Sequence, residues 1–421
     1  MFTSSQKKII ALSSLGGALE FYDFVIFVFL AKLLGELFFP TISPLASLMA
    51  SLAVFAIGYL ARPLGGILFG HFGDKFGRKT TFVTTVMLMA IPTFLIGLLP
   101  TYHSVGILAS IMLVILRLLQ GLSVGGEIPG AIVFITESVA TERRGFATGL
   151  IFFGVNMGLL TGSLVSAFLN DFLSTEQLMS WGWRLPFLFG GLLGFVSYYL
   201  RKQLSETPAF SLINNAQNII KLPAKEVLTK YTSPLLRVMA LACLQAVIIS
   251  ITILFFPTYL ATFFHFPLEK LLNLNTFNIL LFAAPTLFTS YLSDKIGRKK
   301  VILVGILFYI LAIYPLYSLF HYQDFSLVIL VSLACGLFGS FIAGVFPCMS
   351  SELFPTQVRY TGVAMSYNFA FGIIGGLSPL LATHLIHRTG NLIAPSWLLI
   401  FGAVIAFLAW LTTRETYQIA L

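Results

Sequence analysis

Five charged residues lie inside long apolar stretches in the first third of the chain: Glu20, Asp23, Arg62, Arg117 and Glu127. A charge at the centre of a lipid bilayer costs at least about 2.5–3.5 kcal/mol, so such residues are rare and usually functional. A poorly hydrated acid changes its proton affinity with its surroundings, and an arginine can neutralise that acid or bind a carboxylate. These residue types predict proton exchange or carboxylate binding within a membrane.

The depth of these residues places most of them together. At 1.5 Å per residue, Glu20 and Asp23 lie roughly 15–20 Å from one end of their apolar stretch, and Arg62 and Arg117 lie roughly 15 Å from an end of theirs. Glu20 and Asp23 are three residues apart and so share a helix face. We expect Asp23 and Arg117 to form a proton-coupling pair, with Glu20 and Glu127, which lies roughly 15 Å nearer the cytoplasm, as alternative acids. A permanent ion pair between two helices is the structural alternative.

Arg62 and Arg117 could instead bind a substrate carboxylate, because the planar guanidinium group matches a carboxylate with two parallel hydrogen bonds. Gln120 lies close to the same helical stripe as Arg117. The second half of the chain has no charge in the central parts of its apolar stretches and would supply neutral contacts. Its candidates, for which packing between helices is the competing interpretation, are Tyr259, Asn273, Asn278, Tyr367 and Asn368.

The composition excludes a soluble protein. Of 421 residues, 57% are hydrophobic and 10% are charged, and the mean hydropathy is +0.93, whereas a soluble domain has about 25% charged residues. The three cysteines fall inside apolar stretches without metal-ligand spacing, so neither a disulfide framework nor a metal site is expected. The histidines are scattered and no catalytic cluster is present, so the sequence does not indicate an enzyme. Protons are the only cofactor-like species we expect.

Stretches of roughly 20 apolar residues can span a bilayer as helices, and the sequence contains about twelve. They lie near 10–34, 48–70, 80–99, 106–136, 146–170, 184–201, 236–263, 270–292, 301–320, 326–350, 361–386 and 393–413. Of the Lys and Arg residues, Lys32, Arg184, Lys270 and Arg388 fall on one side, Arg62 and Arg117 fall inside spans, and all others fall on the opposite side. A surplus of basic residues marks the cytoplasmic side, so both termini are expected there. The net charge of +9 is then a topology signal, and no nucleic-acid partner is expected.

A charged turn is repeated once in each half of the chain. GHFGDKFGRKT at 70–80 recurs as SYLSDKIGRKK at 290–300, and an E-x6-R pair after span four recurs after span ten. The sequence therefore predicts an all-α membrane protein of twelve helices in two six-helix bundles related by a pseudo-twofold axis, an arrangement typical of carriers. We expect bundles at 1–200 and 236–421, joined by a cytoplasmic linker at 201–235. The repeats predict two mixed-charge clusters, formed by Asp74, Arg78, Glu137 and Arg144 and by Asp294, Arg298, Glu352 and Arg359.

The repeated turn at 70–79 resembles the loop 2–3 signature of the major facilitator superfamily. Further segments are similar to its metabolite:proton symporter branch, whose members carry proline and betaine, α-ketoglutarate, citrate or shikimate. They are GGALEFYDF (16–24), ARPLGGILFG (61–70), RLLQGLSVGGE (117–127), WGWRLPF (181–187), ETPAF (206–210) and ELFPTQVRYTG (352–362). The resemblance implies that the mixed-charge clusters are a cytoplasmic gate that breaks when the cytoplasmic side opens. Topology and loop solvation are the alternative explanation of these charges.

Together these features favour a proton-coupled secondary transporter that takes up a small carboxylate-bearing metabolite, either proline or betaine or a di- or tricarboxylate, by alternating access. We expect it in a bacterial-type cytoplasmic (inner) membrane as a multi-pass protein that functions as a monomer. Its partners would be the metabolite, protons and the lipid bilayer. A proton-driven exporter of drugs or metabolites and a membrane sensor without transport remain alternatives at this stage.

Overall fold

Apolar helices make up most of the chain in a computed structural model that describes residues 2–40 and 43–418. The first half contains α1 (Ser4–Phe29), α2 (Ala31–Phe38), α3 (Pro44–Phe76), α4 (Arg78–Leu98), α5 (Tyr102–Val105), α6 (Ile107–Ser138), η1 (Thr141–Arg143), α7 (Arg144–Phe172), α8 (Thr175–Gln177), η2 (Leu178–Gly182) and α9 (Arg184–Lys202). Two short helices follow, α10 (Pro208–Asn215) and α11 (Pro223–Lys230). The second half contains α12 (Thr232–Ile249), η3 (Ser250–Leu254), α13 (Phe256–Phe264), α14 (Leu268–Ile296), α15 (Arg298–Leu311), α16 (Ile313–Ser318), η4 (Leu319–Tyr322), α17 (Phe325–Ala343), α18 (Phe346–Glu352), η5 (Thr356–Val358), α19 (Arg359–Phe369), η6 (Ala370–Gly375), α20 (Gly376–Thr389) and α21 (Pro395–Thr412).

Each of the twelve predicted spans falls on one or more of these helices. By length and composition, 10 helices among the described residues can cross a membrane, or 11 if the segments Arg298–Leu311 and Ile313–Tyr322, bent by 47°, form one span. The remaining predicted span is α9, a 19-residue helix with Arg184 at its start and Arg201 and Lys202 in its last turn. These basic ends reduce its mean hydropathy.

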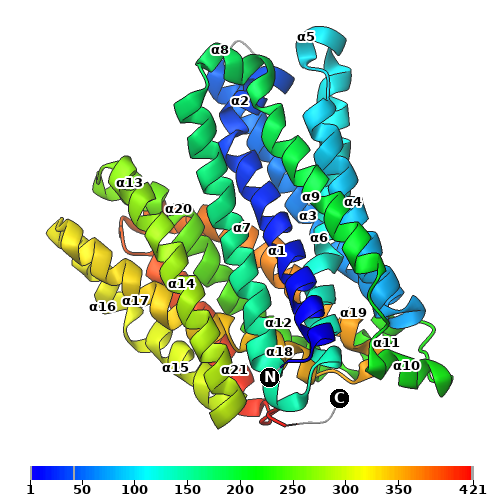
Figure 1. The fold of residues 1–421 in the computed structure, drawn as a ribbon. Helices are drawn as coiled ribbons and strands as arrows, with labels where there is room; N and C mark the ends of the chain where they lie inside the picture. Colours follow the sequence, from blue (N-terminus) through cyan, green and yellow to red (C-terminus); the bar gives the residue numbers. More distant parts are fainter. Residues whose placement is uncertain (1, 41–42, 419–421) are drawn as a thin grey trace.

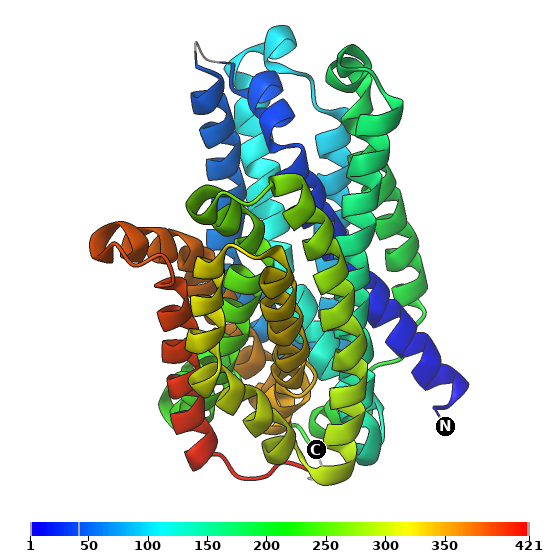
Figure 2. The ribbon, with the colours of Figure 1, turned by 90° about the vertical axis from the view of Figure 1, so that its left-hand side faces the viewer.

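The two halves pack as separate bundles that meet along one side. Within the first half, α1 packs on α7, α3 on α6 and α4 on α9; within the second, α12 packs on α21 and α14 on α17. Across the halves, α7 packs on α14 and α3 on α19. The halves lie close together at the lower end in Figure 1 and spread apart toward the upper end. The first and last described residues lie at the lower end, also after a 90° turn (Figure 2).

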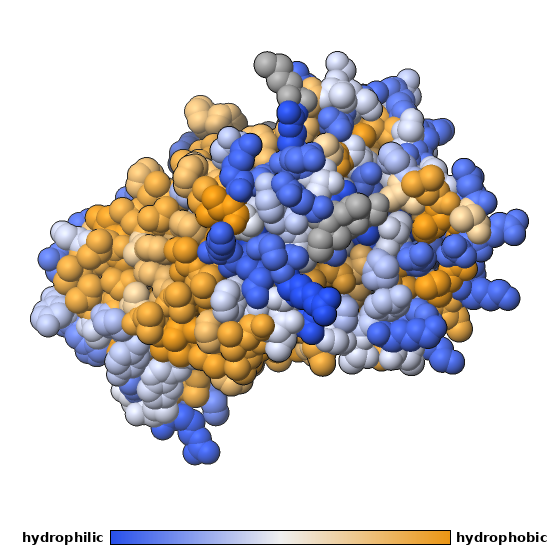
Figure 3. Space-filling model, turned by 90° about the horizontal axis from the view of Figure 1, so that it is seen from below, coloured by the Kyte–Doolittle hydropathy of each residue, from blue (hydrophilic) through white to orange (hydrophobic). Residues whose placement is uncertain are grey.

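The lower end also carries much of the polar surface. Figure 3 shows hydrophilic residues gathered over the centre of this end and hydrophobic residues along the flanks, on the second half above all. Apolar flanks around a polar end are what a lipid-embedded bundle requires, because lipid chains offer polar side chains no hydrogen bonds.

Local sequence sets the helix breaks that matter for the site. The glycine of the repeated turn has φ +112° at Gly77 and +104° at Gly297, a backbone conformation that glycine adopts without steric cost. This glycine is the single residue between α3 and α4 in the first half and between α14 and α15 in the second. The segments η3 and η6 are π-helical, and such short departures from α geometry often occur at functional positions.

Candidate functional site

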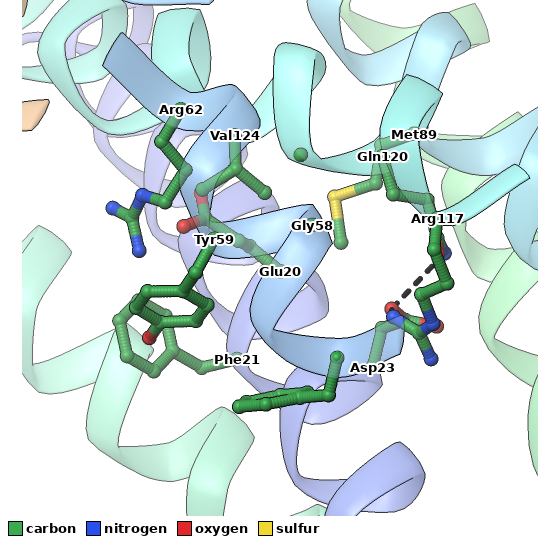
Figure 4. Close-up of a pocket in the computed structure, with 12 residues that line it drawn as sticks. Glu20, Phe21, Asp23, Gly58, Tyr59, Arg62, Met89, Arg117, Gln120 and Val124 are labelled. Atoms are coloured by element: carbon green, nitrogen blue, oxygen red, sulfur yellow. Dashed lines mark hydrogen bonds and ion pairs between the residues drawn. The ribbon is translucent and has the colours of Figure 1, made fainter. Parts of the chain in front are cut away.

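A cavity of about 40 Å³ lies among helices α1, α3, α4 and α6, room for about three water molecules at about 10–15 Å³ each. Figure 4 shows Glu20, Tyr59 and Arg62 on one side of it. Asp23, Arg117 and Gln120 lie on the other side. Further residues of its lining are Phe21, Phe55, Gly58, Met89, Gly121 and Val124. Of the five charged residues singled out in the sequence, four meet at this cavity.

Asp23 and Arg117 form a buried ion pair, with 2.9 Å between Arg117 Nη1 and Asp23 Oδ2. Gln120 donates to the same carboxylate oxygen at 3.0 Å and to the Thr93 hydroxyl at 2.7 Å. The guanidinium carbon of Arg117 lies 3.7 Å from the centre of the Phe27 ring, and an aromatic face attracts a cation. The pairing between the first and fourth spans that the sequence predicts is thus present.

The other side of the cavity is formed by Glu20 and Arg62, which are both buried. The guanidinium of Arg62 lies 5.0 Å from the centre of the Tyr59 ring and 5.9 Å from that of Tyr367. On both sides of the cavity, buried polar atoms have no hydrogen-bond partner: Glu20 Oε2, Asp23 Oδ1, Arg62 Nη2, Arg117 Nε and Nη2, and Gln120 Oε1. An unsatisfied buried polar group is costly, so this concentration indicates a place where water, a proton or a solute binds.

Glu127 lies apart from these residues and does not line the cavity. Its carboxylate pairs with Arg201 at 2.6 Å and accepts from the Thr85 hydroxyl at 2.8 Å. Arg201 also donates to the carbonyl groups of Phe82 and Leu12. Arg201, expected from the sequence only as a charge on the cytoplasmic side, is completely buried. With both carboxylate oxygens bonded, Glu127 is suited to holding α1, α4, α6 and α9 together.

The neutral candidates of the second half separate into two groups. Tyr259 donates to the Leu392 carbonyl at 2.7 Å, Asn278 donates to the Thr252 carbonyl at 3.5 Å, and Asn273 is exposed. None of these three lines the central cavity. Tyr367 and Asn368, by contrast, contact Arg62 across the boundary between the halves.

The first charged cluster joins the halves at the lower end. Glu137 accepts from Arg78 at 3.3 Å and from Arg359 of the second half at 2.7 Å. Asp74 pairs with Arg78 at 3.0 Å. Its two oxygens also accept from the backbone N–H groups of Tyr360 and Thr361, at 3.2 and 2.8 Å. These N–H groups are in the first turn of α19, where a negative charge is favoured by the helix dipole.

The second cluster repeats the contacts of the aspartate and of the first arginine with the halves exchanged. Asp294 pairs with Arg298 at 2.6 Å and accepts from the N–H groups of Gly145 and Phe146 at the start of α7, at 2.9 and 2.7 Å. Arg298 also pairs with Glu352 at 3.1 Å. The carboxylate of each repeated turn therefore caps a helix of the opposite half. Arg144 donates to the Thr136 carbonyl at 2.9 Å, as Arg359 does to the Ser351 carbonyl at 3.1 Å.

A further repeated pair of residues was not predicted from the sequence. Glu206 accepts from the N–H of Lys79 at 3.1 Å, and Thr207 donates to Glu137 at 2.7 Å. At the end of the second half, Glu415 accepts from the N–H of Arg298 at 3.0 Å. The neighbouring Thr416 donates to Glu352 at 2.6 Å. The repeated Glu-Thr dipeptide at 206–207 and 415–416 was the available signal, but two residues are too short to stand out without the structure.

We expect Glu206→Ala to lower the free energy of unfolding by about 1 kcal/mol, the usual value of a helix cap, because α4 loses its acceptor. Glu206→Gln keeps an acceptor oxygen and should recover most of this loss. Burial raises the pKa of Glu206, so its stabilisation is greatest at low pH and is lost as pH rises through the raised pKa. Denaturation in detergent across pH 4–8 measures this slope. A slope in Glu206→Gln equal to that of the unsubstituted protein would contradict the assignment.

The paired bundles, the buried charged cavity between helices of one bundle and the reciprocal clusters at one end define a multi-pass membrane transporter. The model of the Major Facilitator Superfamily matches residues 10–285 and 271–419. The chain belongs to this superfamily, as the repeated turn indicated, and it is a transporter rather than an enzyme.

Named relatives and solved structures agree with this assignment. The chain is 34% identical over 422 residues to the proline/betaine transporter of Escherichia coli K12, with 97% of this chain and 84% of the relative covered. It is also 34% identical to the glycine betaine/proline/ectoine/pipecolic acid transporter OusA of Dickeya dadantii, with 97% and 83% covered. The proton:xylose symporter XylE bound to 6-bromo-6-deoxy-D-glucose shares the fold, with a TM-score of 0.81, 19% identity, and 98% and 97% covered.

Proposed function

We propose that the protein takes up a small zwitterion such as proline or a betaine together with protons. The two relatives named for proline and betaine, each 34% identical, support this substrate class over the di- and tricarboxylates that the sequence left open. Proton coupling is supported by buried acids that face a cavity and by membership of a superfamily that includes proton symporters.

The charge balance of the cavity carries the proposal. Two acids, Glu20 and Asp23, face two arginines, Arg62 and Arg117, so the lining is neutral when all four are ionised. A zwitterion adds no net charge to this site, whereas a di- or tricarboxylate adds two or three negative charges to a poorly hydrated space, which is costly. The rings of Phe21, Phe55 and Tyr59 suit an apolar body and a quaternary ammonium group.

The coupling step follows from the Asp23–Arg117 ion pair. A proton that arrives from outside neutralises the Asp23 carboxylate and ends its ion pair with Arg117. Arg117, whose Nε and Nη2 already lack partners, is then free to bind the carboxylate of the solute. After the cytoplasmic side opens, the solute leaves, Asp23 releases its proton to the cytoplasm, and the ion pair forms again.

The remaining assignments complete this proposal. The reciprocal clusters act as the cytoplasmic gate of a bacterial inner-membrane protein, and both termini are then on the cytoplasmic side. Residues 1–200 and 236–421 form the two moving bundles, and residues 201–235 link them. The protein functions as a monomer and does not bind nucleic acid. Contacts of Asp74 and Asp294 with helices of the opposite half support the gate.

Uptake into vesicles that contain the purified protein tests the function. With an inward proton gradient, we expect radiolabelled proline or glycine betaine to accumulate above its external concentration, and citrate to compete weakly. A protonophore should abolish this accumulation and leave exchange of internal for external proline intact. Accumulation that persists after the gradient has collapsed, or uptake of citrate in preference to both zwitterions, would reject the proposal.

A further inference from the structure

One backbone carbonyl of α6 depends on the opposite half for its hydrogen bond. In a helix, the carbonyl of Gly125 would accept from the N–H of residue 129, but that residue is a proline and has no N–H. The side-chain amide of Asn368 on α19 donates to this carbonyl at 2.7 Å. The neighbouring carbonyl of Gly126 accepts from the Tyr360 hydroxyl at 2.8 Å. The second half therefore bonds to α6 at the point where proline opens its backbone.

The same amide group contacts the cavity. Arg62 Nε lies 3.5 Å from the side-chain oxygen of Asn368, and Arg62 Nη2 has no partner. Asn368 thus touches a cavity arginine with its oxygen and the α6 backbone with its nitrogen, and it is completely buried. Its nitrogen also donates to the Ala364 carbonyl of its own helix at 2.8 Å, which fixes the orientation of the amide.

Close packing makes this bridge between the halves sensitive to small movements. A Cβ atom at Gly66 would lie 2.7 Å from the amide nitrogen of Asn368, and one at Gly70 would lie 2.7 Å from the Cα of Thr361. α19 therefore lies directly on the glycine face of α3. Asn368 is also two residues before the π-helical segment η6, so the regular helix α19 passes into irregular helical geometry just after this residue.

We propose that Asn368 is a positioning residue that couples occupancy of Arg62 to release of the cytoplasmic closure. This inference rests on the proposed function and adds to it that the solute carboxylate, which Arg117 binds on one side of the cavity, also binds Arg62 on the other side. A solute carboxylate that binds Arg62 draws its guanidinium group away from the Asn368 oxygen. Asn368 then loses its contact with α3 and keeps only its bonds to backbone carbonyls, which weakens the joint contact of α19 with α3 and α6 and favours separation of the halves at the cytoplasmic end. Without solute, Arg62 holds Asn368 in place and the closure persists.

Alkylation of Cys348 reports the opening, because this thiol is fully buried beside Glu352, to which it donates at 3.2 Å. The background Cys243→Ser, Cys335→Ala leaves it as the only cysteine. We expect maleimide to react slowly without proline and at least about tenfold faster with it. In the Asn368→Leu variant, whose leucine has a similar volume and no amide, Cys348 should react quickly without proline. Proline should not accelerate this reaction further. The control Ser366→Ala removes only a bond to Gly362 on the same helix and should behave as the background does.

A second variant tests the bridge without changing Asn368. Pro129→Ala restores an N–H that can bond to Gly125 within α6, so the Asn368 bond becomes redundant and alkylation without proline should accelerate. The inference is wrong if both variants keep a slow, proline-accelerated reaction, if proline does not accelerate the reaction in a background that transports it, or if Asn368→Leu raises only the KM for proline. Absence of proline and betaine transport by the unsubstituted protein would instead reject the proposed function.

Discussion

Asp23→Asn is expected to abolish uphill accumulation while leaving solute exchange across the membrane intact. A pH difference of about two units supplies about 2.7 kcal/mol per proton, enough for about 100-fold accumulation. An asparagine cannot bind and release a proton, so the substituted protein should only equalise the two concentrations. Vesicles at zero membrane potential with an imposed pH difference measure this as loss of nearly the whole 100-fold gradient.

The physical reason lies in the geometry of the ion pair. Asparagine keeps the shape of Asp23 and can still accept from Arg117 and Gln120, which lie 2.9 and 3.0 Å from Asp23 Oδ2. The fold should therefore persist, and Arg117 should be permanently available to a solute carboxylate. We expect exchange of internal for external proline at rates within about threefold of the unsubstituted protein, together with binding that no longer depends on pH.

Glu20→Gln is the matched control, because Glu20 lies on the same helix and lines the same cavity. If Asp23 carries the proton, Glu20→Gln changes affinity but retains accumulation. Loss of accumulation in Glu20→Gln and its survival in Asp23→Asn would transfer the coupling role to Glu20. Survival in both variants would remove these acids from proton coupling altogether.

Much of the fold follows from the sequence because lipid imposes simple rules. Apolar length predicts the helices, and the repeated turns predict two related halves. The broken helices were not predicted: the π-helical segments η3 and η6 and the 47° bend after Leu311 have no distinctive composition. They depend on how neighbouring helices pack, which a single sequence does not reveal.

The candidate site, like the fold, could be predicted from the sequence only in part. Asp23 and Arg117 were predicted to pair because buried charges of opposite sign must neutralise one another. The partner of Glu127 was not predicted, because Arg201 lies at a helix end where a basic residue is normally solvated. The reciprocal capping by Asp74 and Asp294 was also missed. Its acceptors are charged and recognisable in the sequence, but its donors are backbone groups with no residue type of their own.

Glu137→Gln is expected to have the largest effect at the lower end of the molecule. Glu137 is buried and accepts from Arg78, Arg359 and Thr207. Loss of its charge leaves two buried guanidinium groups without a shared counterion, and breaking such a pair costs about 3–5 kcal/mol. The closed arrangement should become less populated by at least about 100-fold relative to the open one. Maleimide reaction at Cys348 in the single-cysteine background measures this change.

The control Glu142→Gln removes the same charge from an exposed position in the adjoining turn, so its effect should remain within about 0.5 kcal/mol. The melting temperature, measured together with Cys348 alkylation, distinguishes a role of Glu137 in the gate from a role within its own bundle. Because Arg359 belongs to the second half and Arg78 to the first, a gate residue must change both stability and Cys348 exposure. If Glu137→Gln lowers the melting temperature while Cys348 stays protected, the carboxylate stabilises its own bundle through Arg78, and closure depends on the backbone bonds of Asp74 and Asp294 instead.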